Sequence, residues 1–305
     1  MVDVIAPEHV SVLFDTEDTY GDGGSASSPD FQWIGIIEDA GLPYDPSFKE
    51  CRGIGSVDIS ALSSGMKNAE MTLKWFVQRK RTSPTYNPAT FFLHALNPPT
   101  GLALGYEATY GSSYLSEWFL GVQIDSLEID FDIEGFVKSS AKFVCQDVTI
   151  DDALIVANSR ESNPLDVSTA EALPLTGHDV EVFVNEAGAA DSPMTNIKRG
   201  KFYLKNNWVK IPVVRASDSD LLKYLLRGKR ELGGEITVYV ETKAELDFLT
   251  GKTLLDIRFD LHKTDNAPYF NFTNAKLKTG SLSTRVNEIP CELTLPFEST
   301  GLSIA

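Results

Sequence analysis

Cysteine and histidine are scarce in this sequence, and neither shows the spacing typical of a metal site or a redox pair. The three cysteines, Cys51, Cys145 and Cys291, lie far apart and lack the CxxC spacing of metal sites and redox pairs. The four histidines form no HxH or HxxxH pair, so the sequence predicts no metal site. A nucleophile elbow and a P-loop are missing, and Gly53 and Gly55 lack the third glycine of a dinucleotide-binding loop. We therefore expect no cofactor and no enzymatic activity.

Long apolar runs are missing as well. No run of eighteen apolar residues could form a transmembrane helix, and no apolar segment follows a basic start as in a signal peptide. We expect no association with a membrane. The isolated cysteines fit a reducing compartment. The sequence thus indicates a folded protein made in a cytoplasm, and either used there or carried out within an assembly.

The sequence also contains few basic residues relative to acidic ones. The chain has 27 Lys and Arg against 43 Asp and Glu, a net charge of -16. Residues 1–150 carry -12 (21 acids, 9 bases) and residues 151–305 carry -4 (22 acids, 18 bases). A nucleic-acid binder needs cations that displace the counterions of the phosphates. This composition excludes a DNA-binding protein, but it is compatible with one that lets DNA pass without gripping it.

Alternation of apolar and polar residues is the main pattern that the sequence does contain. In 119–131, Leu127, Ile129 and Phe131 fall on one face and the polar residues between them on the other, as in a half-buried strand. A turn at 132–135 and a second alternating segment at 137–144 complete an antiparallel hairpin. Segments 272–282 and 291–297 show a similar pattern near the C-terminus.

The similarity between the two halves extends upstream, where 70–77 resembles 235–240. The offset is 165 residues at this match (70 to 235) and 153 at the hairpin (119 to 272). The first copy then carries about twelve additional residues, which we assign to the proline-rich segment 82–100. Order and spacing favour duplication over chance similarity between strands. The predicted organisation is a first β domain at 1–150, a connector at 151–176 and a second β domain at 177–305.

Helices are expected in few places. The clearest lies at 217–228, where Ser217 can cap the start, leucines between 221 and 226 form an apolar stripe, and Gly228 ends the helix. A second, short helix is possible at 168–172. A turn signal at 205–207 separates strand segments at 197–204 and 208–214. The predicted fold class is mainly β, a sandwich or barrel with one or two short helices.

Several segments resemble a known family: 33–39, 51–56, 120–127 with 135–141, and 225–237. They are similar to tail tube (major tail) proteins of siphovirus-like viruses of bacteria and archaea. The resemblance implies two tail-tube-type β-sandwich or half-barrel domains, whose hairpins join edge to edge between subunits into a closed β-barrel ring. It also implies that rings stack into the virion tail, after assembly in the host cytoplasm.

The resemblance leaves the ring symmetry open. Family tubes usually show sixfold symmetry from single-domain subunits, so a subunit with two tube domains would form a pseudo-hexameric homotrimer. A hexamer with one tube domain and one accessory domain is the alternative. The implied partners are the tail terminator, baseplate and tape measure proteins, and viral DNA that passes without specific binding. We expect contacts between rings in the polar segments 16–30, 82–100 and 151–173.

The polar strand faces are candidates for the channel lining, because one face of a barrel strand packs on a core and the other meets water. The same faces could equally form the outer surface. An acidic lining would repel phosphates within a Debye length of about 8 Å, while Lys138 and Lys142 across the hairpin would neutralise part of it. The candidate lumen-facing residues are Glu70, Thr72, Lys74, Glu128, Asp130, Glu235, Thr237, Asp256, Arg258 and Asp260.

Two other functions stay open. A related ring-forming tail component, such as a terminator, completion or baseplate hub protein, would share the fold and form a single ring. A β-sandwich carbohydrate-active enzyme would need a signal segment and a cleft rich in exposed aromatic residues, and the sequence shows neither. Carboxylates are so numerous that a glycosidase pair cannot be judged from the sequence.

Overall fold

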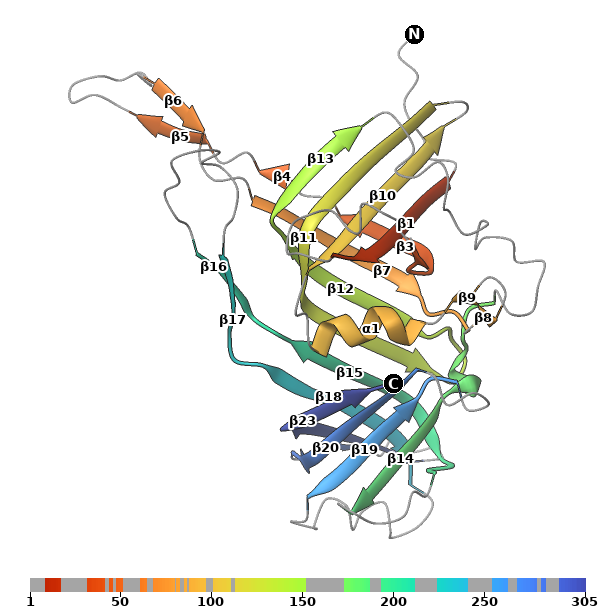
Figure 1. Ribbon diagram of the computed structural model, residues 1–305. Coiled ribbons are helices and arrows are strands. Elements are labelled where there is room, and N and C mark those ends of the chain that lie inside the picture. Colours follow the sequence, from red (N-terminus) through yellow and green to blue (C-terminus); the bar gives the residue numbers. More distant parts are fainter. Residues whose placement is uncertain are drawn as a thin grey trace.

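The protein's computed structural model shows an almost entirely β chain, with one α-helix in the part that it describes (Figure 1). It describes residues 9–17, 32–41, 44–45, 48–51, 61–64, 68–79, 81–82, 85–86, 88–96, 101–110, 113–151, 173–186, 193–211, 224–240, 254–262, 268–278, 281–283 and 291–305.

An extended antiparallel sheet, which we call the long sheet, runs through the molecule (Figure 1). The second half of β11 pairs with β12 on one side and with β15 on the other. Strands from both halves of the sequence therefore share one sheet. Its order is β3 (Ile36–Gly41), β7 (Asn68–Phe76), β12 (Lys138–Cys145), β11 (Ser113–Asp132), β15 (Ile197–Lys205), β18 (Glu231–Tyr239) and β22 (Glu292–Ser299).

The first half of β11 belongs to a second sheet, the first side sheet. There it pairs with β13 (Asp147–Asp151) and β10 (Leu102–Tyr110), and β10 pairs with β1 (His9–Thr16), which pairs with β2 (Gln32–Trp33). The change of partners falls at Gly121, whose φ of 58° lies in the left-handed region that glycine tolerates. Its buried N–H donates to Glu17 Oε1 over 2.7 Å, which fixes this bend.

The second half forms its own side sheet. β14 (Glu181–Glu186) pairs with β19 (Leu255–Asp260), β19 with β20 (Tyr269–Leu277), and β20 with β23 (Gly301–Ile304). The end of β20 and β21 (Ser281–Ser283) pair with β22 and so join the long sheet. At the edges of the long sheet, β3 pairs only with β7 and β21 only with β22 among the described strands. One chain therefore leaves the long sheet open and forms no closed barrel.

Two narrow hairpins extend from one end of the long sheet (Figure 1). β5 (Phe48–Cys51) and β6 (Ala61–Ser64) precede β7, while β16 (Trp208–Ile211) and β17 (Tyr224–Arg227) precede β18. Each neighbouring pair from β7 to β18 is antiparallel, so β7 and β18 run in the same direction and both hairpins lie at the same end. The turn between β11 and β12 lies at the other end. Minor strands are β4 (Tyr44–Asp45), β8 (Arg81–Thr82) and β9 (Thr85–Tyr86).

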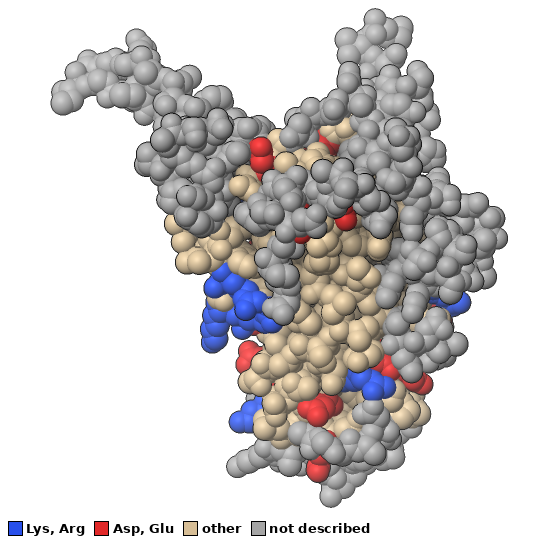
Figure 2. Space-filling model, in the orientation of Figure 1, with Lys and Arg blue, Asp and Glu red and all other residues tan. Residues whose placement is uncertain are grey.

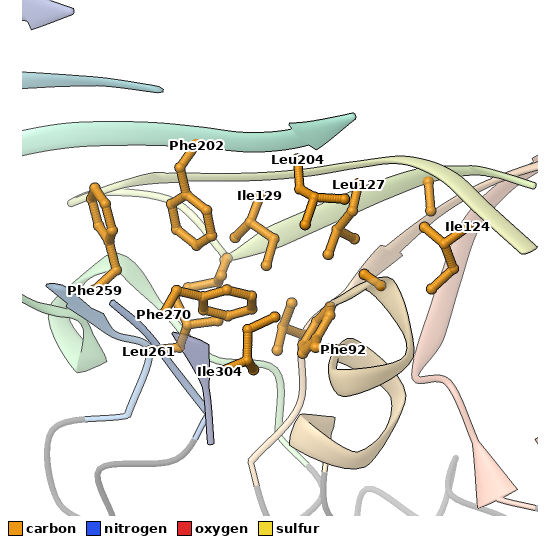
Figure 3. Packing of buried hydrophobic residues seen from close by; sticks show 14 of the residues in the cluster. Phe92, Ile124, Leu127, Ile129, Phe202, Leu204, Phe259, Leu261, Phe270 and Ile304 are labelled. Atoms are coloured by element: carbon orange, nitrogen blue, oxygen red, sulfur yellow. The ribbon is translucent and has the colours of Figure 1, made fainter. Parts of the chain in front are cut away.

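The core lies between the inner face of the long sheet, the side sheets and α1 (Pro88–Leu96), as Figure 3 shows. Phe202 of β15 is 3% exposed, and its ring centroid lies 4.5 Å from that of Phe259 and 4.8 Å from that of Phe270. Phe92 of α1 lies 5.3 Å from Phe270. A helix of the first half thus packs against a strand of the second, and a single core spans both halves.

The strand predictions at 119–131, 137–144, 197–204 and 291–297 are confirmed, but the helix predicted at 217–228 is wrong where the structure describes it. Residues 224–227 form β17, whose Leu226 lies opposite Val209 and Leu225 opposite Lys210. Leucine favours helices, but cross-strand pairing outweighs this intrinsic propensity here, since tertiary context commonly overrides it. Residues 217–223 and the possible helix at 168–172 lie outside the described residues.

The structure describes only part of the segments that we expect to join one ring to the next. Segment 82–100 contains α1, which buries Phe91, Phe92 and Ala95 in the core. These residues of α1 are tied into the core, while Leu93 is 44% exposed, and a contact of this segment with the next ring stays a prediction. Most of 16–30 and of 151–173 lies outside the described residues.

Asp179 ties the start of the second half to the end of β7. Its carboxylate accepts hydrogen bonds of 2.9 Å from Arg79 Nη2, from the Thr176 N–H and from the Thr176 hydroxyl. Burial alone would raise the pKa of Asp179, but the Thr176 hydrogen bonds and the Arg79 charge hold it below its usual value. The stabilisation is therefore present above the carboxyl's unfolded pKa and is lost as the pH falls through the lower folded pKa.

We expect Asp179→Asn to lower the free energy of unfolding by about 1–2 kcal/mol at pH 7, since the charge-assisted bonds are lost. Urea unfolding at pH 7 and pH 3 checks this, with the parent chain as the control. The variant should lose less stability between the two pH values than the parent. Equal losses would show that Asp179 does not contribute in this way.

Candidate functional site

The outer face of the long sheet, which we call the polar face, carries the predicted residues of β7, β11 and β18. Directly opposed residues in a sheet share a face. Glu128 lies opposite Ser140 and Tyr203, and Ser140 lies opposite Lys74. The polar face so defined includes seven candidates, namely Glu70, Thr72, Lys74, Glu128, Asp130, Glu235 and Thr237. Thr237 is only 1% exposed and hydrogen-bonds to Arg199 Nε and Thr294, so it does not itself meet water.

The three candidates on β19 lie elsewhere. Asp256, Arg258 and Asp260 belong to the second side sheet, not to the long sheet. Asp260 is completely buried and accepts two hydrogen bonds of 2.9 Å from Arg258, whose guanidinium lies 4.1 Å from the ring centroid of Phe183. This geometry is that of a structural ion pair, so the structure does not bring these residues together with the other seven.

Charges of both signs alternate along the polar face. Its lysines reach carboxylates on the adjacent strand or on the strand beyond it, so that much of the acidity is balanced locally. Such exposed pairs contribute little stability individually, but they leave few isolated charges on the face. The pairs are Lys74–Asp39 (3.7 Å), Lys138–Glu38 (2.5 Å), Lys142–Glu70 (3.2 Å), Lys201–Glu128 (2.8 Å), Lys205–Glu231 (4.0 Å), Lys198–Glu292 and Lys278–Glu298.

Two carboxylates show how local pairing sets the charge. Burial would raise the pKa of Glu70, but hydrogen bonds from Lys210 and Lys142 hold it below its usual value. Desolvation, with the charge of Glu128, instead raises the pKa of Asp130. Glu70 is therefore a firmly anionic anchor between strands, whereas Asp130 is the more readily protonated position on the polar face.

The described part of the polar face carries a small groove. A groove lined by Thr72, Lys74, Glu128, Lys142 and Tyr203 has a volume of about 260 Å³, below the range typical of ligand sites. Within the described ranges, no cluster of three or more His, Cys, Asp or Glu could hold a metal ion. No described helix is long and apolar enough to span a membrane. What the face can present is a broad, hydrated surface of mixed charge.

Asn206 is a structural residue that the sequence reading missed. Its side chain is fully buried and donates to the Ala95 carbonyl of α1 over 3.0 Å and to the Ile124 carbonyl of β11 over 2.8 Å. Its amide oxygen accepts from Arg230 Nε over 3.1 Å, and Arg230 also donates to the Leu96 carbonyl. Asn206 and Arg230 of the second half thus bind the last carbonyl groups of α1 by hydrogen bonds. In the sequence it is only part of a turn signal.

Comparison with known families decides the identity of the chain. A family model described as phage tail tube protein matches residues 11–298. The chain belongs to the phage tail tube family. This is a structural family and not an enzyme family, and it confirms the resemblance seen in the sequence. The carbohydrate-active enzyme alternative is thereby excluded.

Solved structures give a more distant match for this tail tube protein. The subunit in the hybrid NMR and cryo-EM structure of the SPP1 tail tube is 12% identical, with a TM-score of 0.38. The match covers 56% of this chain and 98% of the SPP1 chain. No curated protein matches the chain significantly. Membership of the family places the protein in the virion tail, as a tail tube component that assembles with itself.

Proposed function

We propose that copies of this protein close into rings, that the rings stack into the tail tube, and that the polar face lines a channel for viral DNA. One observation carries the proposal: β15 of the second half pairs along the second half of β11 from Ser126 opposite Lys205 to Asp132 opposite Arg199. The two halves thus already meet edge to edge, with one shared polar face. Repetition of this junction between chains would curve the sheet into a closed barrel.

The order of strand pairing supports duplicated domains. In the first half, β1 pairs with β10, β10 with β11, β11 with β12 and β13, and β7 with β12 and β3. In the second half, β14, β19, β20, β22, β23, β18 and β15 repeat the same set of pairings in the same order. The domain boundaries expected from the sequence, 1–150 and 177–305, separate these two sets.

Irregularities of register recur at matching places, which chance resemblance between strands would not produce. The β10–β11 ladder shifts between Leu102 and Leu104, and the β19–β20 ladder between Leu255 and Ile257. The β3–β7 ladder shifts between Ile37 and Asp39, and β15–β18 between Ile197 and Arg199. Since β-bulges are designed features of a fold, their recurrence supports common descent of the halves.

The ladders also refine the sequence alignment of the copies. Phe76 lies opposite Lys138, and Tyr239 lies opposite Glu292, the matching position of β22. The offset along β7 and β18 is then 163 residues (76 to 239) and not 165. A shift of two residues keeps each side chain on the same face of its strand, so the assignment to the polar face is unchanged.

Two domains in each chain favour a ring of three copies with pseudo-sixfold symmetry. A hexamer, in which each chain contributes one tube domain and one accessory domain, is the other arrangement. The β11–β15 junction supports the trimer, because both halves contribute strands to the same long sheet. In either ring the closing contact is heterologous, with different edges meeting.

The polar face suits a channel through which DNA slides. Lysines and carboxylates alternate on it and pair with one another, as in Lys201–Glu128 at 2.8 Å. Lysines held by carboxylates are poor phosphate ligands, and the remaining carboxylates repel phosphates within about a Debye length, about 8 Å. The lining we infer is weakly acidic and locally balanced, so that passage without specific binding follows from the paired charges.

Stacking needs two different surfaces at opposite ends of the ring. At the hairpin end, Val209 and Leu226 lie opposite each other and are 56% and 58% exposed. Exposed basic residues surround them, namely Lys205, Arg227 and Lys229, and Figure 2 shows Lys and Arg gathered on this side of the molecule. At the other end, Phe136 is 49% exposed beside the acids Asp132 and Glu134. Apolar contact and opposite charge make these ends complementary.

Electron microscopy of the purified protein tests the proposal. Long hollow tubes are the expected result. Single rings would instead indicate a terminator, completion or baseplate hub role, and monomers at high protein concentration would contradict ring closure. In the virion, the terminator, baseplate and tape measure proteins are the proposed partners, after assembly in the host cytoplasm.

A further inference from the structure

We infer that the contact between neighbouring chains repeats the internal β11–β15 junction in the same register, with Ser283 of β21 in one copy directly opposite Gly41 of β3 in the next. This inference rests on the proposed function, because it specifies the partner strands of the ring contact. It predicts one register out of the many that two free strand edges could adopt.

The internal junction supplies the template. Asp130 lies opposite Lys201, and on the other face Ile129 lies opposite Phe202. Phe131 fills the space above Gly200, where an added Cβ would come within 2.5 Å of the phenylalanine ring. The register is thus fixed by an apolar inner face and by close packing on a glycine, and not by backbone hydrogen bonds alone.

The two strands that would form the ring contact are the open edges of the long sheet. β3 pairs only with β7, and β21 pairs only with β22, among the strands that the structure describes. Unpaired edges of this kind are liable to associate wrongly. Glu38 and Asp39 are exposed on β3, and charges on an edge discourage pairing with unrelated strands. The edges can therefore pair with a specific partner strand, while the charges on β3 disfavour pairing with unrelated strands.

The matching register shifts give the residue offset between equivalent positions of the two halves. Phe119 corresponds to Phe272, because each lies opposite the residue that follows the shift in its ladder, Leu104 or Ile257. With this offset of 153 residues, Ser283 of the second half is the position equivalent to Asp130 of the first half. The partners agree, since Asp130 lies opposite Lys138 and Ser283 opposite Glu292, at matching positions of β12 and β22.

The second strand is placed in the same way. The shift after Ile37 corresponds to the shift after Ile197, an offset of 160. With the same offset, Gly41 of the first half is the position equivalent to Lys201 of the second half. Since Asp130 lies opposite Lys201 within the chain, Ser283 lies opposite Gly41 between chains. Two small residues then replace an acid and a base at this position.

A disulfide tests the register directly, because opposed residues of antiparallel strands lie about 4.5–5.5 Å apart at Cα, within the range a disulfide spans. The variant combines Ser283→Cys with Gly41→Cys. It also carries Thr72→Ala, since a Cβ at Gly41 would come within 2.4 Å of Thr72 Oγ1, and Cys291→Ser, which removes the thiol next to the β22 partner of Ser283. Tubes are oxidised and run on non-reducing gels.

The expected result is a ladder of covalent multimers that ends at the ring size, three copies for the trimer. Two matched controls define the register. Ser281→Cys with Gly41→Cys reports a slip of two residues, and Ser283→Cys with Ala40→Cys places the thiols on opposite faces. Both should cross-link at least tenfold less. Equal cross-linking of either control, or none in the test variant when tubes are present, overturns the register.

Hydrogen exchange on the unmodified protein keeps the inference testable if the cysteine variants do not assemble. Amides of Ile36–Gly41 and Ser281–Ser283 should become protected when rings form. If tubes form without protection of these strands, the inferred contact is wrong while the proposed function stands. If neither rings nor tubes form, the proposed function itself fails.

Discussion

Replacing Val209 and Leu226 together by aspartate is expected to give rings that do not elongate into tubes. The two side chains lie opposite each other on the β16–β17 hairpin and are 56% and 58% exposed. Little buried area is lost in the single chain, so the fold should persist. In the stacked tube, two carboxylates would replace an apolar contact and would face the acidic end of the next ring at Asp132 and Glu134. We expect at least a hundredfold loss of tube mass in sedimentation, with rings visible by electron microscopy.

A matched control separates stacking from a general effect of added charge. Leu254 is 44% exposed and immediately precedes β19 of the second side sheet, so it belongs to neither the β16–β17 hairpin nor the β11–β12 turn. Leu254→Asp should leave tube length unchanged. Phe136→Asp, at the opposite end, should reproduce the defect of the double variant. Tubes of normal length from the Val209→Asp, Leu226→Asp protein would show that this hairpin does not join the rings.

Asn206→Ala is expected to lower the free energy of unfolding by about 2–4 kcal/mol. The substitution leaves the carbonyls of Ala95 and Ile124 without their side-chain donor, and it removes the acceptor of Arg230 Nε. A lost hydrogen bond leaves a buried polar group unsatisfied at about 1–3 kcal/mol each, more when a charged group is involved. The losses are not additive, because the groups share one network. Denaturant unfolding of the purified chain measures the effect.

The neighbouring asparagine provides the control. Asn207 is exposed, has a φ of 53° and donates to the Lys229 carbonyl over 2.7 Å. Asn207→Gly keeps the left-handed backbone accessible, so the loss should stay within about 1 kcal/mol. If both variants are equally stable, Asn206 does not hold the two halves together.

Local patterns were enough for much of the fold. Alternation in 119–131 predicted the second half of β11, and the turn at 132–135 predicted the hairpin to β12, because a strand with one buried face must alternate. The same rule failed to place a polar face in space. Asp256, Arg258 and Asp260 alternate as cleanly as Glu128 and Asp130, yet β19 lies in a side sheet and not in the long sheet.

The helix predicted at 217–228 failed for a related reason. Leucines spaced for a helical stripe also suit a strand whose partner is distant in sequence, and β17 finds that partner in β16. The one described α-helix, α1, lies instead in the segment assigned as an insert. Its Phe92 packs against Phe270 from the other half of the chain, which no local window contains.

The sequence by itself determined the strand-rich class and the absence of catalytic motifs, because each depends on the spacing of residues that are close in the sequence, and its resemblance to tail tube proteins indicated the family. Tertiary structure alone decided which polar faces share a surface, how β11 joins β15, and why Asn206 is buried. These depend on contacts between residues 67 (132 to 199) to 111 positions apart, whose formation is set by packing of the whole core and not by local preference.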